Sequence, residues 1–262
     1  MELTYEEKRH MFEHGYVKVP GVVPRSMVNA ALHAINACVG KGMNQSEMVI
    51  FQTQTFCPEL RSEPVITNLL NKTPMFELAE SLIEPGKVKG WGGQIALRFP
   101  SHPPVNKPRP APHPHIDGTY APNNGVPKGE IHNFTMLGCV LLSELKEPFS
   151  GNFTVWPGTH RTHEAYFRDH GADALVSGMP KNQNLPEPVQ IMGEPGDIVF
   201  AHYLLGHTAA PNFSPNVRYA IFFRLIHADR KQSCCIEAIT DMWLEWPGIR
   251  KLFGEKQQPA LV

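Results

Sequence analysis

The segment APHPHIDGTY (111–120) contains the residues of this chain that are best suited to metal chemistry. His115 and Asp117 are two positions apart, and in an extended strand residues i and i+2 point to the same side. An imidazole nitrogen and a carboxylate oxygen would then lie next to each other and supply two ligands for a metal ion. The remaining protein ligand must come from elsewhere among the 13 histidines of the chain.

A second segment, GDIVFAHYLLGHTAAPNFSPNVRYAIFFR (196–224), offers that ligand and a cation. His207 follows one apolar strand, and Arg218 lies in the next. An arginine on the inner face of a barrel strand is costly unless it meets an anion. We therefore expect Arg218 to bind an acidic ligand near the metal. Arg224 shares the face of Arg218 by parity, so either arginine can hold the acid.

Two histidines and one carboxylate form the facial set that binds non-haem Fe(II) and leaves coordination positions open. 2-Oxoglutarate chelates such a metal and carries a second carboxylate, for which a planar guanidinium is the matching bidentate partner. One hypothesis thus accounts for His115, Asp117, His207 and Arg218. It is an enzyme that uses Fe(II), 2-oxoglutarate and O2.

Three further histidines compete for a place in this site. His202 lies inside the strand before His207, a position that is typical of a core histidine. His113 shares the parity of the first ligand, but Pro114 separates them and favours a position on the rim. His160, in WPGTH, is expected to hold a turn.

Composition excludes several other classes of protein. The net charge of −1, without a long basic or acidic run, predicts no nucleic acid and no anionic membrane as a partner. No apolar run approaches the ~18 residues of a membrane helix. The 5 cysteines form no CxxC pair, which is typical of reduced thiols and predicts a cytoplasmic protein. With 262 residues, the chain suits one large domain.

The period of the hydrophobic pattern changes along the chain, from helical in the first part to strand-like in the second. Residues 1–87 are expected to be mainly helical, with a Thr4/Glu7 capping box, a helix over 25–39 and another that starts at Thr73-Pro74. Six strand-like segments follow, at 92–99, 133–142, 152–156, 188–192, 197–203 and 217–226. No helix alternates regularly with them, which favours an antiparallel barrel or sandwich over a parallel sheet.

Two other segments carry proline signals. The run SHPPVNKPRPAPHP (101–114) is too rich in proline for regular structure and is expected to form a loop on the rim of the barrel. The C-terminal IEAITDMWLEWPGIRKLF (236–253) is expected to be a helix that Pro247 ends or kinks.

Several of these segments, in this order, resemble the phytanoyl-CoA dioxygenase family of Fe(II)/2-oxoglutarate oxygenases. The resemblance covers most of the chain. It rests on the opening LTYEEKRHMFEHGYVKVPGVVP, the HID of 115–117, the segment GNFTVWPGTH, and a distal half formed by Gly196, Asp197, His207, Asn212, Ser214 and Arg218. The chain departs from the family where an aromatic residue often precedes His-x-Asp, because His113-Pro114 stands there.

The resemblance implies a double-stranded β-helix (a jelly-roll, cupin-like barrel) formed by a single domain over 1–262. Within it, 1–87 would be an N-terminal helical layer, 88–228 the jelly-roll core and 229–262 a C-terminal helical segment. His115, Asp117 and His207 would bind iron, and Arg218 would bind 2-oxoglutarate. Gln94 and Thr208 are further candidates for contact with the co-substrate.

The implied reaction is hydroxylation of a small organic substrate, with conversion of 2-oxoglutarate and O2 to succinate and CO2. Relatives that halogenate carry Gly or Ala at the position of Asp117, so the chain is not expected to be a halogenase. Two other functions stay open. One is a jelly-roll protein that binds metal and 2-oxoglutarate without turnover, and the other is a cupin-like isomerase or lyase that uses Zn or Mn.

Overall fold

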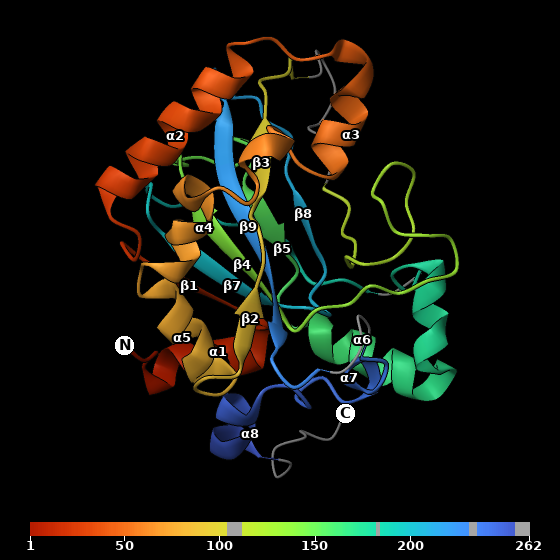
Figure 1. Cartoon of the computed structure of the whole chain (residues 1–262). Coiled ribbons are helices and arrows are strands. Elements are labelled where there is room, and N and C mark those ends of the chain that lie inside the picture. The colour runs from red at the N-terminus through yellow and green to blue at the C-terminus, as the bar shows by residue number, and fades with distance from the viewer. Residues whose placement is uncertain (104–111, 182–183, 231–234, 255–262) are drawn as a thin grey trace.

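The computed structural model describes residues 1–103, 112–181, 184–230 and 235–254 (Figure 1). Its strands pair antiparallel in two sheets. The larger sheet has the order β1 (Tyr16–Val19), β7 (Ile198–His202), β4 (Met136–Leu141), β9 (Arg218–His227), β2 (Val88–Gly90), and β3 (Gln94–Arg98) also pairs with β9. The smaller sheet has the order β6 (Val189–Gln190), β5 (Phe153–Val155), β8 (His207–Ala209).

Five of the described helices come before strand β2 in the chain. They are α1 (Tyr5–His14), α2 (Arg25–Val39), α3 (Met48–Thr53), α4 (Pro64–Asn71) and α5 (Met75–Leu82). Later helices are α6 (Thr159–His170), α7 (Glu237–Thr240) and α8 (Pro247–Phe253), and short 3-10 turns cover Gln45–Glu47, Pro58–Leu60 and Ala172–Ser177. None of the helices in the described part of the chain combines the length and apolar character needed to cross a bilayer.

Helices α2, α4 and α5 cover one face of the larger sheet (Figure 1). Two glycines allow this close packing. A Cβ on Gly138 of β4 would lie 2.6 Å from Met75 of α5, and one on Gly90 of β2 would lie 3.0 Å from Leu70 of α4. The helical layer therefore buries apolar side chains against this face and leaves the opposite face of the sheet for the smaller sheet.

The two sheets contact each other through aromatic side chains. Phe153 of β5 meets Phe222 of β9 edge to face, with 5.3 Å between ring centroids. Phe153 also lies 5.7 Å from the ring of His207 in β8. The space between the sheets is therefore closed by apolar groups at this level, and His207 stands at its border.

The sequence predicted several local features correctly. The Thr4/Glu7 capping box is present at α1, and Gly15 ends that helix in the left-handed conformation. Each of the six expected strand segments contains a strand, and all pairings are antiparallel. The expected 25–39 helix is α2, and the helix expected from Thr73-Pro74 is α5.

Two expectations were wrong. The C-terminal segment is not one helix, because α7 and α8 are separate and Pro247 is the first residue of α8. Proline suits that position, since its missing N–H needs no partner there. His160 lies inside α6 and not in a turn. The expected rim loop at 101–114 falls mostly on residues 104–111, which lie outside the described residues.

Candidate metal centre

His115 and His207 are placed side by side by a backbone bridge. The N–H of His115 donates to the carbonyl of His207 at 3.0 Å, and the N–H of His207 donates to the carbonyl of His115 at 3.1 Å. Residues that exchange both bonds in an antiparallel pair lie directly opposite each other. The two imidazole rings accordingly lie with their centroids 4.6 Å apart.

Asp117 joins the two histidines because the chain turns immediately after it. Gly118 has φ +79°, and a Cβ there would lie 2.2 Å from the carbonyl oxygen of His132. Only glycine tolerates this conformation and this close approach. The turn leaves Asp117 Oδ1 3.3 Å from His115 Nε2 and 3.8 Å from His207 Nε2.

The donor atoms of His115, Asp117 and His207 fit a single metal ion. All three lie within 4.8 Å of one another, and no other such group was found among the described residues. Ligands at about 2.1 Å from an octahedral ion are separated by about 3 Å when adjacent. His207 Nδ1 donates to the carbonyl of Leu205 at 2.9 Å, which fixes the tautomer whose Nε2 lone pair is available to a metal.

Asp117 is held as a carboxylate by its neighbours. Arg224 Nη2 donates to Asp117 Oδ2 at 2.7 Å, so Oδ2 is engaged and Oδ1 faces the histidines. Burial acts to raise the pKa of Asp117, but the charge of Arg224 and the two nearby imidazoles outweigh it. The pKa therefore lies well below its usual range. Arg224 Nη1 also donates to Gln94 Oε1 at 2.9 Å, which ties the carboxylate to β3.

Arg218 lies at the other end of the same strand face and is 3% exposed. Its Nε donates to the carbonyl of Gly151 at 2.7 Å, and Nη1 donates to the carbonyl of Ala96 at 3.0 Å. No carboxylate in the described residues forms an ion pair with it. Burial lowers its pKa to about 10, which leaves it a cation at neutral pH.

One cavity of about 350 Å³ connects these groups. Its polar lining includes the three metal-site residues, Gln94, Thr208, Arg98, Arg218 and Arg224. Its apolar walls include Ile116, Leu137, Phe153 and Phe222. The volume and this mixture of apolar walls with a few convergent polar groups are typical of a small-molecule site.

The competing histidines lie outside the cluster. His202 is buried and neutral: its Nε2 donates to the carbonyl of Met242 at 2.8 Å, its Nδ1 accepts from the N–H of Leu204, and burial lowers its pKa to about 4. His113 is exposed. His160 is buried in α6, where its Nε2 lies 3.2 Å from the carbonyl oxygen of Phe12.

Two contributions to the cavity were missed from sequence. Arg98 lies directly opposite Arg218 in the β3–β9 register and lines the same cavity. Its position four residues after Gln94 in an alternating strand was an available signal. The contact of Arg224 with Asp117 had no local signal, because it depends on the turn at Gly118.

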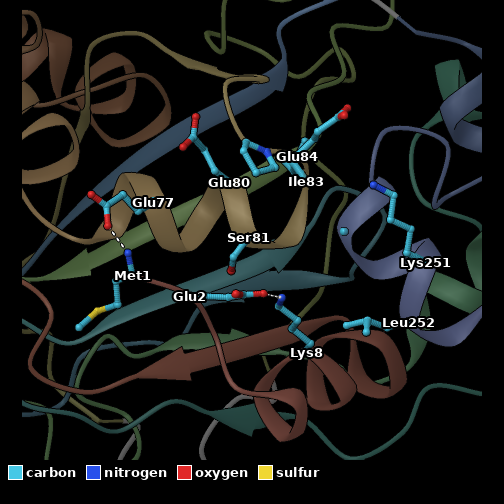
Figure 2. Close-up of a pocket in the computed structure, with 12 residues that line it drawn as sticks. Met1, Glu2, Lys8, Glu77, Glu80, Ser81, Ile83, Glu84, Lys251 and Leu252 are labelled. Carbon is cyan, nitrogen blue, oxygen red and sulfur yellow. Dashed lines mark hydrogen bonds and ion pairs between the residues drawn. The ribbon is translucent and has the colours of Figure 1, made fainter.

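Another hollow lies between α1, α5 and α8 and shares no lining residue with the metal cavity (Figure 2). Several of its charged groups are already paired. The N-terminal amine of Met1 pairs with Glu77, and Lys8 pairs with Glu2, as the dashed lines in Figure 2 show. Its lining has carboxylates but no histidine, so it lacks the combination of histidine and carboxylate ligands found in the metal site.

The fold has relatives among solved structures. They include the non-heme alpha ketoglutarate dependent carbocyclase SnoK from nogalamycin biosynthesis, at 21% identity over 87% of this chain and 85% of that chain (TM-score 0.55). HygX from Streptomyces hygroscopicus, with nickel and 2-oxoglutarate bound, is 15% identical over 86% and 87% (TM-score 0.56). EvdO2 from Micromonospora carbonacea var. aurantiaca is 17% identical over 90% and 96% (TM-score 0.51).

No curated protein sequence matches the chain. The family model described as phytanoyl-CoA dioxygenase (PhyH) matches residues 11–220, which is most of the chain. The match spans His115, Asp117, His207 and Arg218, the residues that converge on the cavity. The chain therefore belongs to the phytanoyl-CoA dioxygenase family.

Proposed function

We propose that the chain is an Fe(II)- and 2-oxoglutarate-dependent oxygenase that hydroxylates a small organic substrate. The observation that carries this proposal is the convergence of His115, Asp117, His207 and Arg218 on one cavity. We also propose that residues 1–262 act as one catalytic domain. The two facing antiparallel sheets would form its double-stranded β-helix, between a helical layer at 1–87 and a C-terminal segment at 229–262.

The proposed reaction converts a substrate C–H, 2-oxoglutarate and O2 into an alcohol, succinate and CO2. Iron, when bound, would supply the activation of O2 that this oxidation needs. The chain contributes the three ligand atoms, His115 Nε2, Asp117 Oδ1 and His207 Nε2. Protein ligands that occupy three positions leave the others open for the co-substrates.

Arg218 would bind the distal carboxylate of 2-oxoglutarate. A guanidinium has five N–H donors. Two of them already donate to the backbone carbonyls of Gly151 and Ala96, which fixes the orientation of the group. The remaining donors are available to an acid in the cavity, and the opposite Arg98 adds positive charge at the same end. Thr208 also lines the cavity and offers a hydroxyl.

Arg224 and Gln94 would act on the metal ligand, and Gln94 also lines the cavity as a candidate for contact with the co-substrate. Arg224 engages Asp117 Oδ2, so that Asp117 would bind the metal through Oδ1 alone. Gln94 holds Arg224 in place. Ile116, Leu137, Phe153 and Phe222 would exclude water from the reacting groups.

Hydroxylation is favoured over halogenation because position 117 is an aspartate. A halide at the metal would have to displace this carboxylate, which Arg224 also stabilises. Some structural neighbours are named for other oxidative outcomes, namely a carbocyclase and an epimerase. Product mass distinguishes these outcomes, because only hydroxylation adds one oxygen atom.

The test is succinate formation coupled to O2 uptake, with Fe(II), 2-oxoglutarate and a panel of small organic molecules. Removal of a ligand in His115→Ala should abolish both signals. His113→Ala is the matched control, because this exposed histidine lies two residues away and outside the cluster. Binding of 2-oxoglutarate without succinate for any substrate would favour a non-catalytic binding protein. Turnover of a substrate without 2-oxoglutarate would favour an isomerase or lyase.

A further inference from the structure

A second cavity adjoins the metal cavity and shares two of its wall residues, Phe222 and Arg224. Its volume is about 480 Å³. Arg224 is in direct contact with the metal ligand Asp117, so the shared wall is one side chain from the proposed iron. A molecule in this second cavity could therefore reach the metal by extending across that wall.

The floor of the second cavity is one face of β9. Phe222, Arg224 and Ile226 alternate along the strand, are each half-buried and line the cavity. Phe134 also lines the cavity, with Arg224 Cζ 5.6 Å from the centre of its ring. This floor is apolar on both sides of a single guanidinium, which suits the flat body of a ring or a short hydrocarbon chain.

Trp91 and Arg61 form the outer wall. Trp91 is 62% exposed, although tryptophan is usually highly buried. The segment that carries it is fixed to the backbone of Arg61, because the N–H of Gly93 donates to the carbonyl of Arg61 at 2.9 Å. A Cβ on Gly92 would lie 2.6 Å from the same carbonyl oxygen. The backbone next to Trp91 is therefore fixed against Arg61, and the indole of Trp91 is exposed to solvent.

The charge of this cavity is positive. No acidic residue is among the described residues that line it. Arg224 is paired with Asp117, Arg230 with Glu245, and the lining His132 with Glu130. Arg61, in contrast, is exposed and has no ion-pair partner in the described part of the chain. The cavity therefore carries one guanidinium whose charge is not compensated by the protein.

We infer that this second cavity is the binding site of the primary substrate, and that the substrate is a small organic acid that carries a ring. Arg61 would donate hydrogen bonds to the carboxylate, and Trp91 would pack on the ring. The remainder would cross Phe222 and Arg224 toward the metal. That the bound acid is the substrate rests on the proposed function. Binding of the acid in this cavity can be measured without turnover.

Binding is measured by calorimetry on the full chain, with benzoate, phenylacetate and cinnamate as probes, each compared with its uncharged amide. The fluorescence of Trp91 serves as a local reporter, because Trp91 lines this cavity whereas Trp156, Trp243 and Trp246 do not. The acids should bind about tenfold more tightly than the amides, since one charge-assisted contact is added. The acids should also change the tryptophan fluorescence.

Two variants place the ligand. Arg61→Gln should remove the preference for the acid, whereas Arg25→Gln, the same change at an exposed arginine outside these cavities, should keep it. Trp91→Ala should weaken the binding of the acid and of the amide alike, by about fivefold. Equal binding of acid and amide, an unchanged preference in Arg61→Gln, or no binding of any acid would each overturn the inference. A chain that binds the acids as expected but forms no succinate would contradict the proposed function alone.

Discussion

Replacing Arg218 by lysine tests how the co-substrate is held. The guanidinium donates from Nε to the carbonyl of Gly151 and from Nη1 to that of Ala96, which leaves three of its five N–H groups for an acid. A lysine ammonium has only three donors. If two of them serve the same buried carbonyls, one donor is left for the carboxylate.

A bidentate carboxylate uses two of the three free donors of the arginine, so the variant should lose one of two charge-assisted hydrogen bonds to 2-oxoglutarate. Such a bond contributes about 2 kcal/mol, and its loss corresponds to about 30-fold weaker binding. The measurement is calorimetric titration of 2-oxoglutarate into the Fe(II)-loaded chain under nitrogen. Thermal unfolding, followed in parallel, would report any loss of fold in the variant.

A second ligand makes this result specific to the distal carboxylate. 2-Oxobutyrate keeps the chelating group of 2-oxoglutarate but lacks the second acid, so its affinity should be the same in the wild type and in Arg218→Lys. Arg224→Lys is the comparison for the other arginine on the same strand face. An unchanged affinity for 2-oxoglutarate in Arg218→Lys, or an equal loss for both ligands, would refute this role of Arg218.

Three further predictions concern the metal ligand, the reaction and the buried core. Arg224→Gln should weaken Fe(II) binding by about tenfold in a metal titration, because Asp117 loses the partner of Oδ2; an unchanged affinity would contradict this. Wild-type enzyme with excess chloride should give no halogenated product by mass spectrometry, since Asp117 fills the position that a halide needs; a chlorinated product would refute that reasoning. Burial lowers the pKa of His202 from 6.5 to about 4. Between these two pH values His202 is protonated in the unfolded chain but neutral in the folded chain. Its contribution to the free energy of unfolding is therefore fully present above pH 6.5 and is lost as the pH falls through about 4. Its share, roughly 3 kcal/mol, should be absent from the acid unfolding curve of His202→Gln, and identical curves for the two proteins would contradict it.

The proximity of His115, Asp117 and His207 could be predicted because part of its signal is local. His115 and Asp117 are two residues apart, and the distance in sequence from His207 to Arg218 spans one strand, a turn and the start of the next strand. The prediction assumed an extended strand at His115. The structure has only a bridge there, and a glycine turn brings Asp117 into place. The convergence was correct, although the local geometry differs.

Helix α6 could not be recognised from hydrophobic periodicity. Its buried face consists of Thr159, His160, His163, Glu164 and Phe167, which is mostly polar. Such a face gives no apolar stripe at the helical period. Some of its polar groups contact distant parts of the chain; for example, Glu164 accepts a hydrogen bond from the N–H of Met242. These contacts depend on the tertiary fold and leave no signal in the neighbouring sequence.

The role of Arg224 was undetermined for a related reason. By parity it shares a face with Arg218, and sequence alone left both as candidates for the acid. The register of β3 against β9 places Gln94 opposite Phe222 and within reach of Arg224, and the turn at Gly118 brings Asp117 to the same guanidinium. The alternation of β9 predicts the same role for Arg218 and Arg224. Strand register and the turn at Gly118 give them different partners.

We propose that His115, Asp117 and His207 bind one iron that 2-oxoglutarate chelates. Anomalous diffraction at the iron edge, from crystals grown under nitrogen with Fe(II) and 2-oxoglutarate, would locate this iron. We expect a single iron peak about 2.0–2.2 Å from His115 Nε2, Asp117 Oδ1 and His207 Nε2, with the distal carboxylate of 2-oxoglutarate on Arg218. An iron bound elsewhere, a missing ligand from this set, or a distal carboxylate bound by Arg224 would contradict it.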